Sequence, residues 1–143
     1  MEFKFKIPLS VRFSDFDSLG HVNNAVILSY FEEARIRYFE EVITGNKVNW
    51  SENGIILAKV IIDFRKPIKD YHNYFVFICC SRLGTKSFDF SYKIIQELNN
   101  DIQVMAEGIT VMVCYNYKTA QTIEMPLGWK KKVELFEGKS LSA

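Results

Sequence analysis

Residues 10 to 39, SVRFSDFDSLGHVNNAVILSYFEEARIRYF, constrain the fold more than any other part of the chain. A polar segment with aspartates, a glycine, a histidine and asparagines runs directly into a helical pattern. Apolar residues recur there at steps of three and four and so share one helix face: Ile27, Tyr30, Phe31, Ala34 and Tyr38. The pattern predicts a helix from about Asn24 to Val42, on the order of 30 Å long.

Alternating apolar residues, or for residues 55–64 and 74–83 runs of apolar and β-branched residues, predict strands on both sides of this helix. The first strand covers residues 3–13, and Pro8 indicates an edge position or a bulge. Four more strands follow the helix, at residues 55–64, 74–83, 88–94 and 102–117. Gly108 interrupts the alternation of the last strand, so we expect a bulge there. The residues after Pro126 predict a short closing helix.

The order of these elements predicts one domain over residues 1–143. Four strands joined by short turns make an antiparallel meander, which would cover the apolar face of the helix. The predicted fold class is therefore α+β, with a curved antiparallel sheet wrapped around one long central helix. Since the helix covers a single sheet face, the other face favours a partner subunit.

Composition narrows the functional classes. A hydrophobic content of 48% and a net charge of +1 give no reason to expect attraction to nucleic acid or to a membrane surface. The sequence has no apolar run near the roughly 20 residues of a membrane span, and MEFKFKIPL lacks the apolar core of a signal peptide. The odd set of three cysteines is interpreted as buried thiols in a reducing cytoplasm.

Polar residues before the helix form the candidate site. In isolation, Asp15 and Asp17 at a strand end would be assigned to turn or capping chemistry, and His21 to a structural hydrogen bond. Asn23 and Asn24 before a helix are by default an N-cap. Their concentration within ten residues at the start of one helix favours a functional role.

That arrangement suits acyl transfer. A helix N-terminus offers unpaired N–H groups and a partial positive charge, which can stabilise the charge that grows on a carbonyl oxygen. A nearby carboxylate can attack the carbonyl or activate water. Gly20 permits close approach of a substrate to the backbone. The sequence contains no competing serine motif and no metal-ligand cluster, so we expect neither a metal nor another cofactor.

The run DFDSLGHVNN at residues 15–24, followed by YFEEAR at 30–35, resembles the active-site signature of hotdog-fold acyl-CoA thioesterases of the 4-hydroxybenzoyl-CoA thioesterase type. The order of one strand, a long helix and four strands also fits the hotdog fold along nearly the whole chain. The resemblance implies hydrolysis of an acyl-CoA thioester. It also implies a homodimer or homotetramer whose active site forms between subunits.

The resemblance further implies roles for the residues of the signature. Asp17 matches the catalytic carboxylate, which acts as general base or nucleophile. The backbone N–H near Asn24 matches the oxyanion donor, and His21 and Asn23 match residues that shape the site. Ile27 stands where the family often has a tyrosine, a departure that bears on the acyl pocket.

Two further segments, FRKPI at 64–68 and RLGTKSF at 82–88, fall where the family has its second strand end and its central hairpin. By this match Lys86 and Ser87, and also Arg65, would help to hold the coenzyme A nucleotide. Leu19 stands where plant acyl-carrier-protein thioesterases carry an asparagine, so their catalytic scheme does not transfer. The alternatives are an acyl-carrier-protein thioesterase, a hotdog hydratase and a non-catalytic acyl-ligand-binding module.

Overall fold

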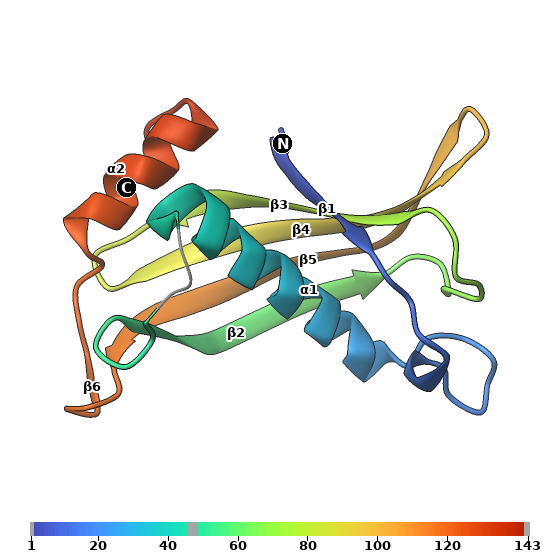
Figure 1. Cartoon of the computed structure of the whole chain (residues 1–143), viewed down its shortest axis with the longest axis horizontal. Coiled ribbons are helices and arrows are strands. Elements are labelled where there is room, and N and C mark those ends of the chain that lie inside the picture. Colours follow the sequence, from blue (N-terminus) through green and yellow to red (C-terminus); the bar gives the residue numbers. More distant parts are fainter. Residues whose placement is uncertain (1, 46–48, 142–143) are drawn as a thin grey trace.

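The computed structural model of the chain describes residues 2–45 and 49–141. Among these residues a curved antiparallel sheet wraps one long helix, α1 (Asn24–Tyr38) (Figure 1). The helix begins where the sequence predicts. Its predicted end near Val42 lies inside a wider π-helical segment over Phe39–Thr44, which stops at Gly45 with φ +71°. The predicted α+β architecture is confirmed.

The strands and remaining helices follow the predicted order, with small additions. The strands are β1 (Phe5–Leu9), β2 (Gly54–Phe64), β3 (Tyr74–Leu83), β4 (Ser87–Leu98), β5 (Asp101–Asn116) and the short β6 (Gln121–Thr122). The helices are a 3-10 turn, η1 (Phe13–Asp15), and the closing helix α2 (Leu127–Glu137). The predicted first strand is shorter than expected, because Asp15 bonds back to Arg12 and winds the chain into η1.

The order of strands across the sheet is β1-β3-β4-β5-β2, with every neighbouring pair antiparallel. Pro8 therefore lies in an edge strand, as predicted. The expected meander of four strands is wrong for β2, which pairs with β5 and forms the other edge of the sheet. Because β5 and β4 lie between β2 and β3 in the sheet, residues 65–73 carry the chain across the end of the sheet before β3 begins.

The expected bulge at Gly108 is also wrong. The register of β5 against β4 shifts between Ala106 and Val104, so Met105 is the extra residue. Gly108 is paired regularly, and its role is steric. A Cβ at this position would lie 2.5 Å from Cε2 of Phe31, so glycine allows the Phe31 ring to lie against the strand.

The core forms between the helix and the concave face of the sheet. All members of the predicted apolar helix face are buried: Ile27, Tyr30, Phe31, Ala34 and Tyr38. Phe31 stacks on Tyr92 of β4 with ring centroids 4.4 Å apart. Arg35, which the pattern places on the polar face, is buried as well, because its Nη1 donates to Tyr92 Oη at 3.1 Å.

Helix α2 closes the far end of α1. The buried Glu137 carboxylate accepts the Tyr38 hydroxyl at 2.6 Å and the Cys80 N–H at 3.0 Å. All three cysteines are free and buried. None of the helices in the described part of the chain is long and apolar enough to cross a membrane.

Candidate active site

The loop before α1 is closed by its own backbone. Gly20 N–H donates to the Asp17 carbonyl at 3.1 Å, and Asp17 N–H donates to the His21 carbonyl at 3.0 Å. Gly20 has φ +85°, a left-handed conformation that favours glycine, and a Cβ there would meet nothing within 4 Å. Glycine is thus required by the turn itself. The turn presents Asp17 at a fixed place beside the helix start.

The Asp17 carboxylate is half-buried and lies next to Asn23, the N-cap residue of α1. Its Oδ1 accepts the Leu19 N–H at 2.9 Å, and its Oδ2 lies 3.4 Å from the amide nitrogen of Asn23. These donors orient the carboxylate without enclosing it. It can therefore still receive a proton or attack a substrate.

The first turn of α1 is capped by Asn23. Its Oδ1 accepts the Ala25 N–H at 2.8 Å, and its carbonyl accepts the Val26 N–H at 2.9 Å. This confirms the default interpretation of the asparagine pair as an N-cap. The N–H of Asn24 has no acceptor among the described residues. The helix start therefore offers a free donor together with its partial positive charge.

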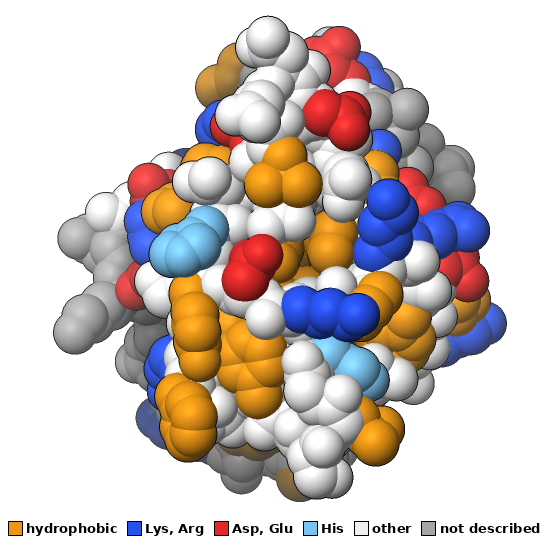
Figure 2. Space-filling model, turned by 90° about the vertical axis from the view of Figure 1, so that its right-hand side faces the viewer, with side chains coloured by type: hydrophobic (Ala, Val, Ile, Leu, Met, Phe, Trp, Pro, Cys, Tyr) orange, Lys and Arg blue, Asp and Glu red, His pale blue; other side chains and the backbone are white. Residues whose placement is uncertain are grey.

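His21 lies beside this donor. Its Nδ1 is 3.1 Å from the Val22 carbonyl oxygen, which can only accept a hydrogen bond. Asn23 thus contacts Asp17, while His21 and Asn24 line a cavity at the same end of α1. Figure 2 faces this end of the molecule and shows acidic, basic and histidine side chains around a hydrophobic hollow.

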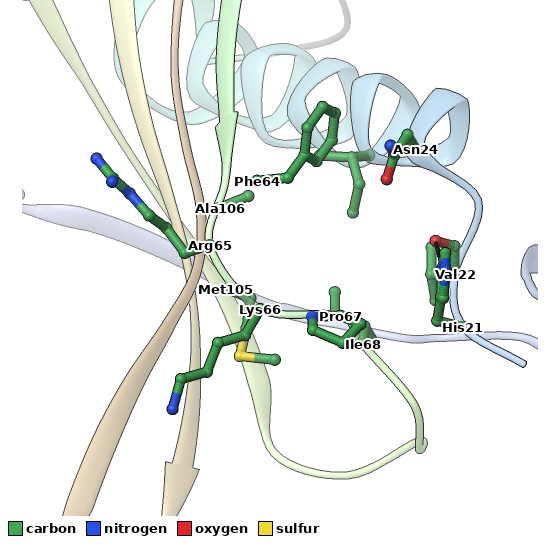
Figure 3. A pocket seen from close by; sticks show the side chains of 11 residues that line it. His21, Val22, Asn24, Phe64, Arg65, Lys66, Pro67, Ile68, Met105 and Ala106 are labelled. Atoms are coloured by element: carbon green, nitrogen blue, oxygen red, sulfur yellow. Dashed lines mark hydrogen bonds between the residues drawn. The ribbon is translucent and has the colours of Figure 1, made fainter.

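A cavity of about 240 Å³ opens next to the helix start. Its apolar wall is made of Val22, Ile27, Phe64, Pro67, Ile68, Met105 and Ala106, and its polar members are His21, Asn24, Arg65 and Lys66. Figure 3 shows the Arg65 and Lys66 side chains directed away from the space between Phe64, Asn24 and His21. The interior is consequently apolar, with the polar groups of the helix start at one side.

Backbone bonds join the cavity wall to the loop of Asp17. The carbonyl of the bulged Met105 accepts the N–H groups of Arg65 at 2.8 Å and Lys66 at 3.1 Å. The Ile68 carbonyl accepts the Val22 N–H at 2.9 Å. The end of β2, the crossing segment and the loop before α1 are therefore held as one unit. The sequence did not reveal Met105 and Ile68 as wall residues, because they are brought here by pairings between distant segments.

The residues expected to hold a nucleotide lie in different places. Arg65 is at the cavity, but its guanidinium is 3.0 Å from Glu107 and 3.6 Å from Asp63. Lys86 and Ser87 are at the β3–β4 hairpin, at the opposite end of the sheet (Figure 1). Ser87 pairs with Val113, whereas the cavity residue Phe64 pairs with Ala106; that offset along β5 is roughly 24 Å at 3.4 Å per residue.

Within one chain, Lys86 and Ser87 are consequently not brought to the cavity. The Ser87 hydroxyl accepts a hydrogen bond from Arg82 at 2.8 Å, while Lys86 is exposed. The described residues contain no group of three or more His, Cys, Asp or Glu side chains that could hold a metal ion.

The model of the thioesterase-like superfamily matches residues 11–133, which include the loop, α1 and the whole sheet from β2 to β5. The chain belongs to the thioesterase-like superfamily. Among curated relatives, YsmA of Bacillus subtilis, an uncharacterised protein, is 32% identical over 92 residues, or 63% of this chain. The acyl-acyl carrier protein thioesterase ATL3 of Arabidopsis thaliana is 25% identical over 114 residues, or 79% of this chain. This thioesterase-like chain spans 60% of the length of each of these relatives.

A solved thioesterase of Thermus thermophilus, complexed with coenzyme A and zinc, is similar along its whole length. It is 29% identical, with a TM-score of 0.79 over 97% of this chain and 98% of that one. The superfamily match and this likeness show that the curved sheet around α1 is the hotdog fold, as the sequence predicts.

Proposed function

We propose that this thioesterase-like chain hydrolyses acyl-CoA thioesters to a free acid and coenzyme A. The observation that carries the proposal is an apolar cavity lined by Asn24, whose N–H is free, with the Asp17 carboxylate next to it at the N-cap residue Asn23. A carboxylate, an oxyanion donor and an acyl-sized space are the parts that thioester hydrolysis needs. Membership of the superfamily supports the same reaction class.

The reaction would use the two groups on the same carbonyl. The Asn24 N–H donates to the thioester oxygen, and the positive end of α1 stabilises the charge that develops there. Asp17 either takes a proton from the water that adds to the carbonyl carbon, or adds itself to give an anhydride that water then hydrolyses. In both routes the carbon–sulfur bond breaks, its electron pair goes to sulfur, and coenzyme A leaves as the thiol.

The acyl group would enter the cavity, with Ile27 forming part of its wall. The apolar wall of this cavity suits an alkyl or aromatic acyl group. A screen of acyl-CoA chain lengths and aryl-CoAs, followed by release of the free thiol, tests the proposal. Absence of hydrolysis across this series would refute an acyl-CoA substrate.

We also propose a homodimer formed through β2. This edge strand exposes large apolar side chains on both faces: Ile56, Leu57, Val60, Ile61 and Phe64. Antiparallel pairing of β2 with its copy would place the Gly54 end of one strand beside the Phe64 end of the other. The hairpin end of one subunit would then face the cavity end of its partner.

This pairing supports a shared site. The partner subunit's Lys86 and the partner subunit's Ser87 would help to hold the coenzyme A nucleotide. The Thermus thermophilus thioesterase is complexed with coenzyme A, which supports coenzyme A as the carrier of the acyl group. Two such dimers packed through their outer sheet faces would make a tetramer. Light scattering at micromolar concentration tests the assembly, and an active, stable monomer would contradict it.

A second candidate is hydrolysis of an acyl-carrier-protein thioester, which the similarity to ATL3 favours. The two differ only in the carrier of the acyl group. Comparing kcat/KM for the same acyl group on coenzyme A and on acyl carrier protein decides between them. Three buried, free thiols fit a reducing compartment, and we place the reaction in the cytoplasm.

A further inference from the structure

Asp15 is a second carboxylate in the loop before α1, and its surroundings differ from those of Asp17. Its side chain is only 3% exposed. Oδ2 accepts the Tyr30 hydroxyl at 2.7 Å and the Arg12 N–H at 3.0 Å, while Oδ1 lies 3.3 Å from the Arg12 guanidinium. Each oxygen therefore has a donor, and no face is left open to a substrate.

The backbone of Asp15 makes a separate contact with the helix. Its carbonyl accepts the N–H of Asn23, the N-cap residue, at 3.0 Å. Tyr30 lies about 10 Å from Asn23 along the helix axis, at ~1.5 Å per residue. One residue thus fastens the loop to α1 at two separated points. The hydrogen bonds of Asp15 with Tyr30 and with the Asn23 N–H therefore restrict the positions of Asp17, two residues later, and of Asn23.

The charge of Asp15 is fixed by the same contacts. Burial opposes ionisation, but the hydrogen bonds from the Arg12 N–H and the Tyr30 hydroxyl outweigh it and hold the pKa of Asp15 below its usual value. Burial and the bond to Asp15 in turn raise the pKa of Tyr30. At neutral pH the pair is therefore a carboxylate that accepts from a protonated hydroxyl, which suits an anchor.

We propose that Asp15 and Tyr30 are positioning residues for hydrolysis, which hold the loop of Asp17 in register with the free N–H at the start of α1. The inference rests on the proposed hydrolase function. It assigns the two aspartates of the loop to different tasks: Asp17 meets the substrate, and Asp15 places Asp17. A displacement of about 1 Å between reacting groups can lower a rate by about 10²-fold.

The helix contains a matched control for the Tyr30–Asp15 bond. Tyr38 lies on the same buried face, and its hydroxyl donates at 2.6 Å to the buried carboxylate of Glu137. This bond has the same chemistry, but it joins α1 to α2 at the end of the helix remote from the cavity. Tyr38→Phe should therefore reproduce the structural effect of Tyr30→Phe without its effect on the loop.

The experiment compares kcat, KM and melting temperature for four variants on the best acyl-CoA substrate. Tyr30→Phe should lower kcat about tenfold with little change in KM. Tyr38→Phe should keep wild-type kcat. Both substitutions should lower the melting temperature. Asp15→Ala should lower kcat about 10-fold to 100-fold. Asp15→Asn keeps an acceptor for Tyr30 and should retain most of the wild-type kcat.

Each outcome decides the proposal. Wild-type kcat in Tyr30→Phe overturns the proposal. An Asp15→Asn variant that is as inactive as Asp17→Asn also overturns it, because Asp15 would then take part in the chemistry. Equal loss of kcat in Tyr30→Phe and Tyr38→Phe overturns it too, since general destabilisation would explain both. A wild-type protein that hydrolyses no thioester overturns the hydrolase function and this inference together.

Discussion

Substitutions of Asn23 should separate two tasks of one side chain. Its Oδ1 caps α1 through the Ala25 N–H at 2.8 Å, and its amide nitrogen lies 3.4 Å from Asp17 Oδ2. Serine at this position retains an acceptor for the cap but has no amide that reaches the carboxylate. Alanine retains neither group. The pair Asn23→Ser and Asn23→Ala therefore distinguishes stability from catalysis.

The structure sets the size of both effects. Loss of an N-cap acceptor costs about 1 kcal/mol, which in a domain of this size lowers the melting temperature by about 3 to 5 °C. The contact with Asp17 is long and partly exposed, so it is worth at most about 1.4 kcal/mol, or tenfold in kcat. We expect Asn23→Ser to melt near wild type with kcat reduced up to tenfold, and Asn23→Ala to lose both.

Thermal melts and steady-state hydrolysis of acyl-CoA measure the two quantities on the same samples. A serine variant that loses as much melting temperature as the alanine variant would refute the assignment of the cap to the side-chain oxygen. A serine variant with wild-type kcat would refute a contribution of the amide to Asp17.

Three further predictions concern Gly108, Asp70 and Lys86. Gly108→Ala, whose Cβ would lie 2.5 Å from Phe31, should lower unfolding free energy by about 1 to 3 kcal/mol in urea, whereas Gly128→Ala, which meets nothing within 4 Å, should not lower it. Burial opposes ionisation of Asp70, yet the hydrogen bonds from Tyr74 and the His72 N–H lower its pKa below 3.8. The stabilisation by the Asp70 carboxylate is therefore present above that pH and lost below it, and Asp70→Asn should flatten the fall in stability as the pH drops below about 4. Lys86→Ala should raise KM for acyl-CoA with little change in kcat, and should matter much less for a truncated thioester without the nucleotide.

The parts of the fold that depend on local signals could be predicted from the sequence. The cap, the start of α1 and its buried face follow from Asn23 and from apolar spacing over Ile27 to Tyr38, because a helix is specified by neighbours in sequence. The strands follow from alternation or from apolar and β-branched runs in the same way, although β1 is shorter than predicted. At Gly20 the sequence predicts room for a substrate, whereas its left-handed turn conformation is shown only by the structure.

Three other features depend on contacts between distant segments. Nothing near β2 in the sequence shows that it pairs with β5, because the two strands are far apart in the chain. The helical pattern predicts that Arg35 lies at the surface, but the hydrogen bond to Tyr92 allows it to be buried. Asp15 looks equivalent to Asp17 until the fold brings Tyr30 to its carboxylate.

The most direct test of the account is hydrolysis by Asp17→Asn, in which the side chain keeps its shape and loses its charge. With the fold verified by a near-wild-type melting temperature, we expect kcat/KM for the best acyl-CoA to fall by about 10²-fold or more. Asp15→Asn, measured beside it, should retain most activity. Near-wild-type hydrolysis by Asp17→Asn together with an inactive Asp15→Asn would contradict the account and transfer the chemistry to Asp15.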